Sequence, residues 1–257
     1  PISAKEVWRV SEDGELRDPF KKLTTVFQMS EEMFFLHYGK DGCNRHVLID
    51  ECRELFGEIY EQIPELPFCN IWTAMQLSSR LPKGALFHMG VSNTRRCWNM
   101  FQLPESVESA CNVGCCGIDG CVSTLVGASL VNPDRLCYVV VGDLTFFYDL
   151  NSLGNHHIGT NLRVMLVNNG RGTEFRLGIH HCNVFGDDAD KYMAAAGHFG
   201  NKSPLLVKHY AEDLGFHYLS ATTKEEFMTA LSNFTNPQLS DHSMILEVFT
   251  DSKDESE

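Results

Sequence analysis

The sequence contains no hydrophobic run long enough to cross a membrane and no excess of basic residues. No stretch of 18 consecutive apolar residues occurs in the 257 residues, so no transmembrane helix is expected. Lysine and arginine together number 21, against 34 aspartate and glutamate residues, which gives a formal net charge of −13. Because a chain this acidic repels a phosphate backbone, we expect no nucleic-acid partner.

Features of secreted proteins and of dinucleotide-binding proteins are also missing. The N-terminal residues show no basic segment followed by an apolar one, so no signal peptide is expected. The 10 cysteines therefore indicate reduced, mostly buried thiols in a cytoplasmic protein rather than a disulfide framework. No Gly-x-Gly-x-x-Gly motif follows the first buried strand, which argues against a Rossmann-type dinucleotide site. The chain starts at Pro1 rather than at methionine, which suggests a piece of a longer polypeptide.

Buried strands and amphipathic helices alternate along most of the chain. Residues 136–141 and 163–167 are continuous apolar runs, which are typical of central parallel strands. Further strands are expected at 7–10, 85–89 and 244–249, and helices at 44–62, 71–81, 120–130, 144–153, 204–214 and 224–234. The predicted fold class is therefore α/β, a mostly parallel sheet with helices on both faces. Pro64 and Pro67 predict a domain boundary near residues 63–68.

Polar residues follow the two central strands at the point where each strand ends. Asp143 comes directly after Gly142, and Asn168 and Asn169 follow the next strand. In an open α/β sheet, ligands bind in the crevice outside the carboxyl ends of the strands. Carboxylate, amide and carbonyl oxygens suit Mg²⁺, which takes its other ligands from water and phosphate groups. The same residues could also be plain turn residues between strands.

This pattern resembles the signature of enzymes that depend on thiamine diphosphate (ThDP), in which Gly-Asp-Gly is followed by Asn-Asn. Here 25 residues separate Asp143 from Asn169, as in that family, while Leu144 takes the place of the glycine at the third motif position. Gly-Asp-Leu, with residues 90–96 and 112–120, resembles one branch of the family. Those synthases make 2-succinyl-5-enolpyruvyl-6-hydroxy-3-cyclohexene-1-carboxylate (SEPHCHC) from isochorismate and 2-oxoglutarate.

The resemblance implies a role for each matched residue. The fold would be the diphosphate-binding (PP) domain of a ThDP enzyme, with Mg²⁺ held by the side chains of Asp143 and Asn169 and the carbonyl of Arg171. The residues implied in cofactor binding are Ser92, Gly117, Ile118, Gly142, Asp143, Leu144, Thr145 and Asn169. The residues implied in catalysis are Ile118 as an apolar wedge against the cofactor, Phe175 on the substrate side and Arg96 toward a substrate carboxylate.

One departure bears on the substrate. The synthases have arginine where this chain has Val113. Because a charge-assisted hydrogen bond contributes roughly 1.5–3 kcal/mol, this loss argues against the synthase substrates. We therefore expect a 2-oxo acid decarboxylase or carboligase, a lyase or transferase, that acts on a different 2-oxo acid.

The resemblance also implies partners. The catalytic glutamate of these enzymes belongs to a pyrimidine-binding domain, and nothing in this chain resembles that domain. Residues 63–257 would be the PP domain, and residues 1–62 the tail of a central domain with a linker helix. The pyrimidine-binding domain would come from the same or another subunit of a homo-oligomer, so the fragment alone would be inactive. The alternative is a non-catalytic PP-type binding or regulatory module.

Histidine and cysteine clusters suggest metal sites only weakly. His156-His157 and His180-His181 are adjacent pairs whose side chains diverge on any regular element, so exposed or hydrogen-bonded histidines are expected. Cys111, Cys115, Cys116 and Cys121 lack the second pair that a zinc site requires.

Overall fold

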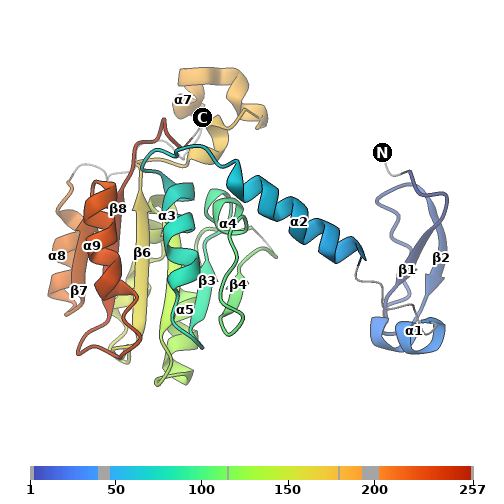
Figure 1. Cartoon of the computed structure of the whole chain (residues 1–257), viewed down its shortest axis with the longest axis horizontal. Helices are drawn as coiled ribbons and strands as arrows, with labels where there is room; N and C mark the ends of the chain where they lie inside the picture. Colours follow the sequence, from blue (N-terminus) through green and yellow to red (C-terminus); the bar gives the residue numbers. More distant parts are fainter. Residues whose placement is uncertain (1–2, 40–46, 115, 179, 193–202, 256–257) are drawn as a thin grey trace. The chain divides into compact units, whose positions relative to one another are not determined.

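The computed structural model divides the chain into two compact units, Pro1–Ile63 and Pro64–Glu257. It describes residues 3–39, 47–114, 116–178, 180–192 and 203–255 (Figure 1). The division falls within the boundary region expected from the two prolines. That the first unit is the tail of a central domain stays a prediction.

The first unit contains a small parallel sheet. Strand β1 (Val7–Val10) pairs with β2 (Leu23–Phe27), and helices α1 (Glu31–Tyr38) and α2 (Val47–Glu61) follow. Ser30 caps α1 by accepting a hydrogen bond from the Met33 amide, which satisfies one of the helix's free N–H groups. The ring of Phe27 lies 4.9 Å from Phe34, so aromatic packing joins β2 to α1.

The second unit is built on a six-stranded sheet in which all strands are parallel. The strand order is β4-β3-β5-β6-β8-β7. The strands are β3 (Leu86–Met89), β4 (Glu108–Cys111), β5 (Cys137–Gly142), β6 (Leu162–Asn168), β7 (His217–Ala221) and β8 (Met244–Phe249). The expected α/β fold class with a mostly parallel sheet is confirmed.

Helices cover both faces of this sheet, and α3 and α9 are seen in front of the strands in Figure 1. One core includes residues of α3 (Asn70–Leu77), α4 (Asn93–Trp98) and α9 (Lys224–Phe234). The other includes residues of α5 (Cys121–Val131), α6 (Asp143–Asp149) and α8 (Leu206–Asp213). Strand β5 contributes side chains to both cores, because Tyr138 and Val140 face the first core while Val139 and Val141 face the second.

Short helices complete the second unit. They are η1 (Ser78–Arg80), η2 (Leu150–Gly154), η3 (Thr173–Arg176), η4 (His181–Asp188) and α7 (Ala189–Tyr192). Two expected helices are shorter than predicted, because α3 and α6 tighten into the 3₁₀ helices η1 and η2 in their last turns. None of the described helices combines the length and apolar composition needed to cross a membrane.

Strand β2 of the first unit was not predicted from the sequence. In the six-stranded sheet, β4 and β7 were not predicted either. They form the two edges of the sheet. Three of the four residues of β4 are exposed, and β7 contains the polar residues His217 and Ser220. Neither strand carries the continuous apolar run that identifies a strand buried on both faces.

Candidate functional site

The strand order places a crevice between β3 and β5. The chain leaves β3 for β4 at one side and returns to β5 on the other, so the loops after β3 and β5 diverge. A cavity of about 320 Å³ lies there. It is lined by residues that follow β3, β5 and β6, with additional residues from α3 and the loop before α5.

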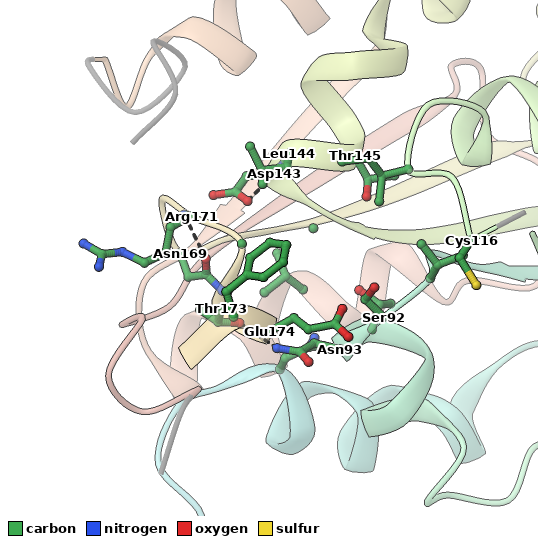
Figure 2. Close-up of a pocket in the computed structure, with 18 residues that line it drawn as sticks. Ser92, Asn93, Cys116, Asp143, Leu144, Thr145, Asn169, Arg171, Thr173 and Glu174 are labelled. Carbon is green, nitrogen blue, oxygen red and sulfur yellow. Dashed lines mark hydrogen bonds between the residues drawn. The ribbon is translucent and has the colours of Figure 1, made fainter. Parts of the chain in front are cut away.

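Most of the predicted site residues line this cavity (Figure 2). They are Ser92, Ile118, Gly142, Asp143, Leu144, Thr145, Asn169, Arg171 and Phe175. Gly117 and Arg96 are not among the lining residues. Gly117 directly precedes Ile118, and Arg96 lies on α4.

The acid and the amide that were predicted to bind a metal come from neighbouring strands. Gly142 at the end of β5 pairs in register with Val167 of β6, so Asp143 and Asn169 both follow the paired ends. The Asp143 side chain is only 2% exposed, and its Oδ1 accepts a hydrogen bond of 2.8 Å from the Leu144 amide. Asn169 Oδ1 accepts one of 3.2 Å from the Arg171 amide. These are hard oxygen donors of the type that Mg²⁺ prefers.

Hydrogen bonds from more distant elements hold the asparagine pair. Asn168 Nδ2 donates to Glu247 Oε1 at 2.8 Å, and the Tyr218 hydroxyl donates to Glu247 Oε2 at 2.7 Å. Glu247 is 1% exposed, and its burial raises the pKa of the carboxyl group. The Thr250 amide, which follows β8, donates to the Asn168 carbonyl at 3.2 Å. The loop after β6 is therefore fixed by β7, β8 and the segment that follows β8.

The backbone is strained at two points of the cavity wall. Three described non-glycine residues have positive φ, and two of them, Ser92 (φ 62°) and Cys116 (φ 53°), line the cavity. Such conformations cost on the order of 1–3 kcal/mol and concentrate at functional sites. The cavity therefore resembles a binding site in its strained backbone as well as in its shape.

Glu174 and Arg96 form an ion pair beside the cavity. Arg96 Nη1 lies 2.8 Å from Glu174 Oε1. Burial acts to raise the pKa of Glu174. The hydrogen bonds from Ser92 and Arg96, with the charges of Arg96 and His180, outweigh it, so the pKa lies below its ordinary value. Glu174 is therefore ionised at neutral pH.

Comparison with known proteins gives this geometry a family context. No family model matches the chain. It is 34% identical over 252 residues to the SEPHCHC synthase of Bacteroides fragilis and 32% identical over 255 residues to that of Phocaeicola vulgatus. Each alignment covers 96% of this chain. The chain is a divergent relative of the SEPHCHC synthases.

The chain is much shorter than these synthases. The alignment covers 43% of the Bacteroides fragilis protein and 42% of the Phocaeicola vulgatus protein. Among the described residues, no group of three or more His, Cys, Asp or Glu side chains could hold a metal ion. His156 and His157 are exposed, and Val113 is 42% exposed and does not line the cavity.

Several lining residues were not found by sequence reasoning. They are Asn70, Val91, Asn93, Thr94, Cys116, Val167, Gly172, Thr173 and Glu174. Asn93 Nδ2 donates to Thr173 Oγ1 at 2.7 Å and so joins the loops after β3 and β6. Glu174 directly precedes Phe175, which the resemblance did identify, so its position was a usable signal. The ion pair between Glu174 and Arg96 could not be found from the sequence, because the two residues are distant along the chain.

Proposed function

We propose that this chain is the ThDP- and Mg²⁺-binding part of an enzyme that decarboxylates a 2-oxo acid or transfers the resulting fragment. One observation carries the proposal. An acid, an amide and the backbone of Arg171 meet the hydroxyl residues Ser92 and Thr145 around one cavity, at the crevice between β3 and β5. The relationship to the synthases supports the same conclusion.

The donor set fits the metal and the diphosphate. Asp143 and Asn169 would hold Mg²⁺ through side-chain oxygens, and Arg171 through its carbonyl. Ser92 and Thr145 present hydroxyl groups at the same cavity, where they would donate hydrogen bonds to the diphosphate. A magnesium ion compensates the negative charge that Asp143 and a diphosphate bring together.

The apolar part of the cavity suits the organic part of the cofactor. Ile118, Leu144 and Phe175 line it, and all three are half-buried. Such side chains exclude water and fix a ring by contact rather than by charge. When bound, ThDP supplies the electron sink that 2-oxo acid decarboxylation requires. Ile118 would set the bend of the cofactor, and Phe175 and Arg96 would face the substrate.

The rest of the active site would come from another domain. Because the chain spans about two fifths of the length of its synthase relatives, we propose that the remainder supplies a pyrimidine-binding domain with the catalytic glutamate. That domain would meet the cavity from the same polypeptide or from a second subunit of a homo-oligomer. On this view the isolated chain has little or no turnover.

The first prediction tests the metal ligand. Asp143→Asn keeps an oxygen that can accept from the Leu144 amide but removes the charge that holds Mg²⁺. In the complete protein, we expect magnesium-dependent ThDP affinity to fall by more than the roughly 10–100-fold typical of removing a group that only supports a ligand. Isothermal titration calorimetry measures this affinity, and circular dichroism checks that the variant is folded.

Asp134→Asn is the matched control, because Asp134 is exposed and precedes β5 at the other end of that strand. It should bind ThDP as the unaltered protein does. Wild-type affinity in Asp143→Asn would remove Asp143 from the metal site. ThDP binding by the complete protein without turnover of any 2-oxo acid would favour the non-catalytic binding module.

A further inference from the structure

The cavity wall carries more negative than positive charge. Among its described lining residues, Asp143 and Glu174 are acidic and Arg171 is basic. Asp143 is assigned to the metal in the proposed function. Glu174 remains as a second carboxylate, and no part of that assignment requires it.

Glu174 neutralises the arginine that would otherwise attract a substrate carboxylate. Its Oε1 lies 2.8 Å from Arg96 Nη1, and the Arg96 Nη1 group also donates to Asn93 Oδ1 at 3.3 Å. The Glu174 side chain is 21% exposed and that of Arg96 42% exposed, so the pair is partly withdrawn from water. Partial burial strengthens the attraction within the pair and the repulsion of a second carboxylate.

The position of Glu174 sets it apart from the metal ligands. Figure 2 shows its carboxylate extending toward Ser92, on the opposite side of the cavity from Asp143. Glu174 also directly precedes Phe175, which lines the same cavity. The proposed function turns Arg96 and Phe175 toward the substrate, and Glu174 contacts the first of these residues and directly precedes the second.

We infer that Glu174 makes the enzyme selective for 2-oxo acids whose remaining chain carries no second carboxylate. This inference rests on the proposed function and names its substrate class. A distal carboxylate would have to share Arg96 with Glu174 across a short distance, and two like charges at one partly buried site repel each other. A neutral chain meets Ile118 and Phe175 without that cost.

The test compares two 2-oxo acids of equal length in the complete protein with ThDP and Mg²⁺. The ratio of kcat/KM for 2-oxopentanoate to that for 2-oxoglutarate should be at least about 10 in the unaltered enzyme. Glu174→Gln keeps the shape of the side chain and removes its charge, so the ratio should fall at least about 10-fold through a gain for 2-oxoglutarate. A tenfold change corresponds to about 1.4 kcal/mol of differential binding.

Glu108→Gln is the matched control, because Glu108 also pairs with an arginine at 2.9 Å but lies on the edge strand β4 and does not line the cavity. It should leave the ratio unchanged. Equal use of both acids, an unchanged ratio in Glu174→Gln, or turnover of neither acid by protein that binds ThDP would overturn the inference alone. Absence of magnesium-dependent ThDP binding would overturn the proposed function as well.

Discussion

Ser92 holds an unfavourable backbone conformation on the side of the cavity toward which Glu174 extends. The Ser92 side chain lines the cavity in which a diphosphate would bind. Local strain of this kind persists only when the surrounding structure imposes it. Ser92 directly precedes α4, and Arg96 of that helix pairs with Glu174. The properties of single residues at this site, such as the backbone conformation of Ser92 and the charge of Glu174, therefore have to be considered together with their neighbours.

His88 on β3 gives a prediction that depends on pH. The side chain is 4% exposed, and burial lowers its pKa below the ordinary 6.5, with a hydrogen bond involving Asn112 acting in the opposite direction. The unfolded chain therefore binds a proton at His88 more readily than the folded chain does. Above pH 6.5 the histidine is neutral in both states, and as the pH falls below 6.5 its protonation favours the unfolded state and lowers the free energy of unfolding. The free energy of unfolding should therefore fall less between about pH 7.5 and about pH 5.5 in His88→Gln than in the unaltered chain.

Urea unfolding at the two pH values measures the difference. His156→Gln provides the control, since His156 is exposed and its replacement should leave the pH dependence as it is. Parallel pH profiles for the unaltered chain and His88→Gln would show that this histidine titrates in the folded state as it does in the unfolded one.

At the scale of elements, the site depends on segments that contain none of the motif residues. The segment after β8 brings Glu255 to the Asn70 amide at the start of α3, at 2.9 Å. The Thr250 hydroxyl donates to the same carboxylate oxygen at 2.7 Å, and the Thr250 amide donates to the carbonyl of Asn168, next to the proposed metal ligand, at 3.2 Å. Burial raises the pKa of the Glu255 carboxyl group. Glu255 therefore joins α3 to the segment after β8, and Thr250 joins that segment to the strand end beside the proposed metal-binding loop.

Removal of this acid should destabilise the second unit. Glu255→Ala leaves the Asn70 amide and the Thr250 hydroxyl without their acceptor, so we expect the free energy of unfolding to fall by about 1–3 kcal/mol. Glu255→Gln should lose less, because its amide oxygen can still accept from both groups. Chemical denaturation measures both variants. Asp254→Ala, at an exposed neighbouring position, is the control, and an equal loss in that variant would contradict the assignment to Glu255.

At the scale of the whole molecule, the second unit contains everything that lines the cavity. The cavity residues lie between Asn70 and Phe175, and both apolar cores are built from residues of Pro64–Glu257. A unit that has its own hydrophobic core and contains all strands of its sheet is expected to fold independently. The first unit has its own parallel strand pair and aromatic contacts.

Residues 64–257 expressed alone should therefore unfold in one cooperative transition, as seen by circular dichroism during heating. A shorter fragment that ends at Asp241 removes β8, which lies between β6 and β7 in the sheet, and should not fold. A broad, non-cooperative transition for residues 64–257 would show that the second unit needs the first.

The sequence by itself determined the centre of the fold and part of the site. The apolar runs at β5 and β6 identify buried parallel strands because both of their faces must be covered. The spacing of Asp143 and Asn169 then predicts that an acid and an amide meet at adjacent strand ends, and both do line one cavity. Local patterns of this kind can be recognised in the sequence because burial and turn chemistry act on residues that are neighbours along the chain.

Only the tertiary structure decided the rest. The edge strands β4 and β7 have no apolar signature, since one side of each faces no further strand. The contacts of Arg96 with Glu174, and of Asn70 with Glu255, join residues that are far apart along the chain. Such pairs exist because the sheet brings its loops to one end, and neither residue of a pair signals its partner in the sequence.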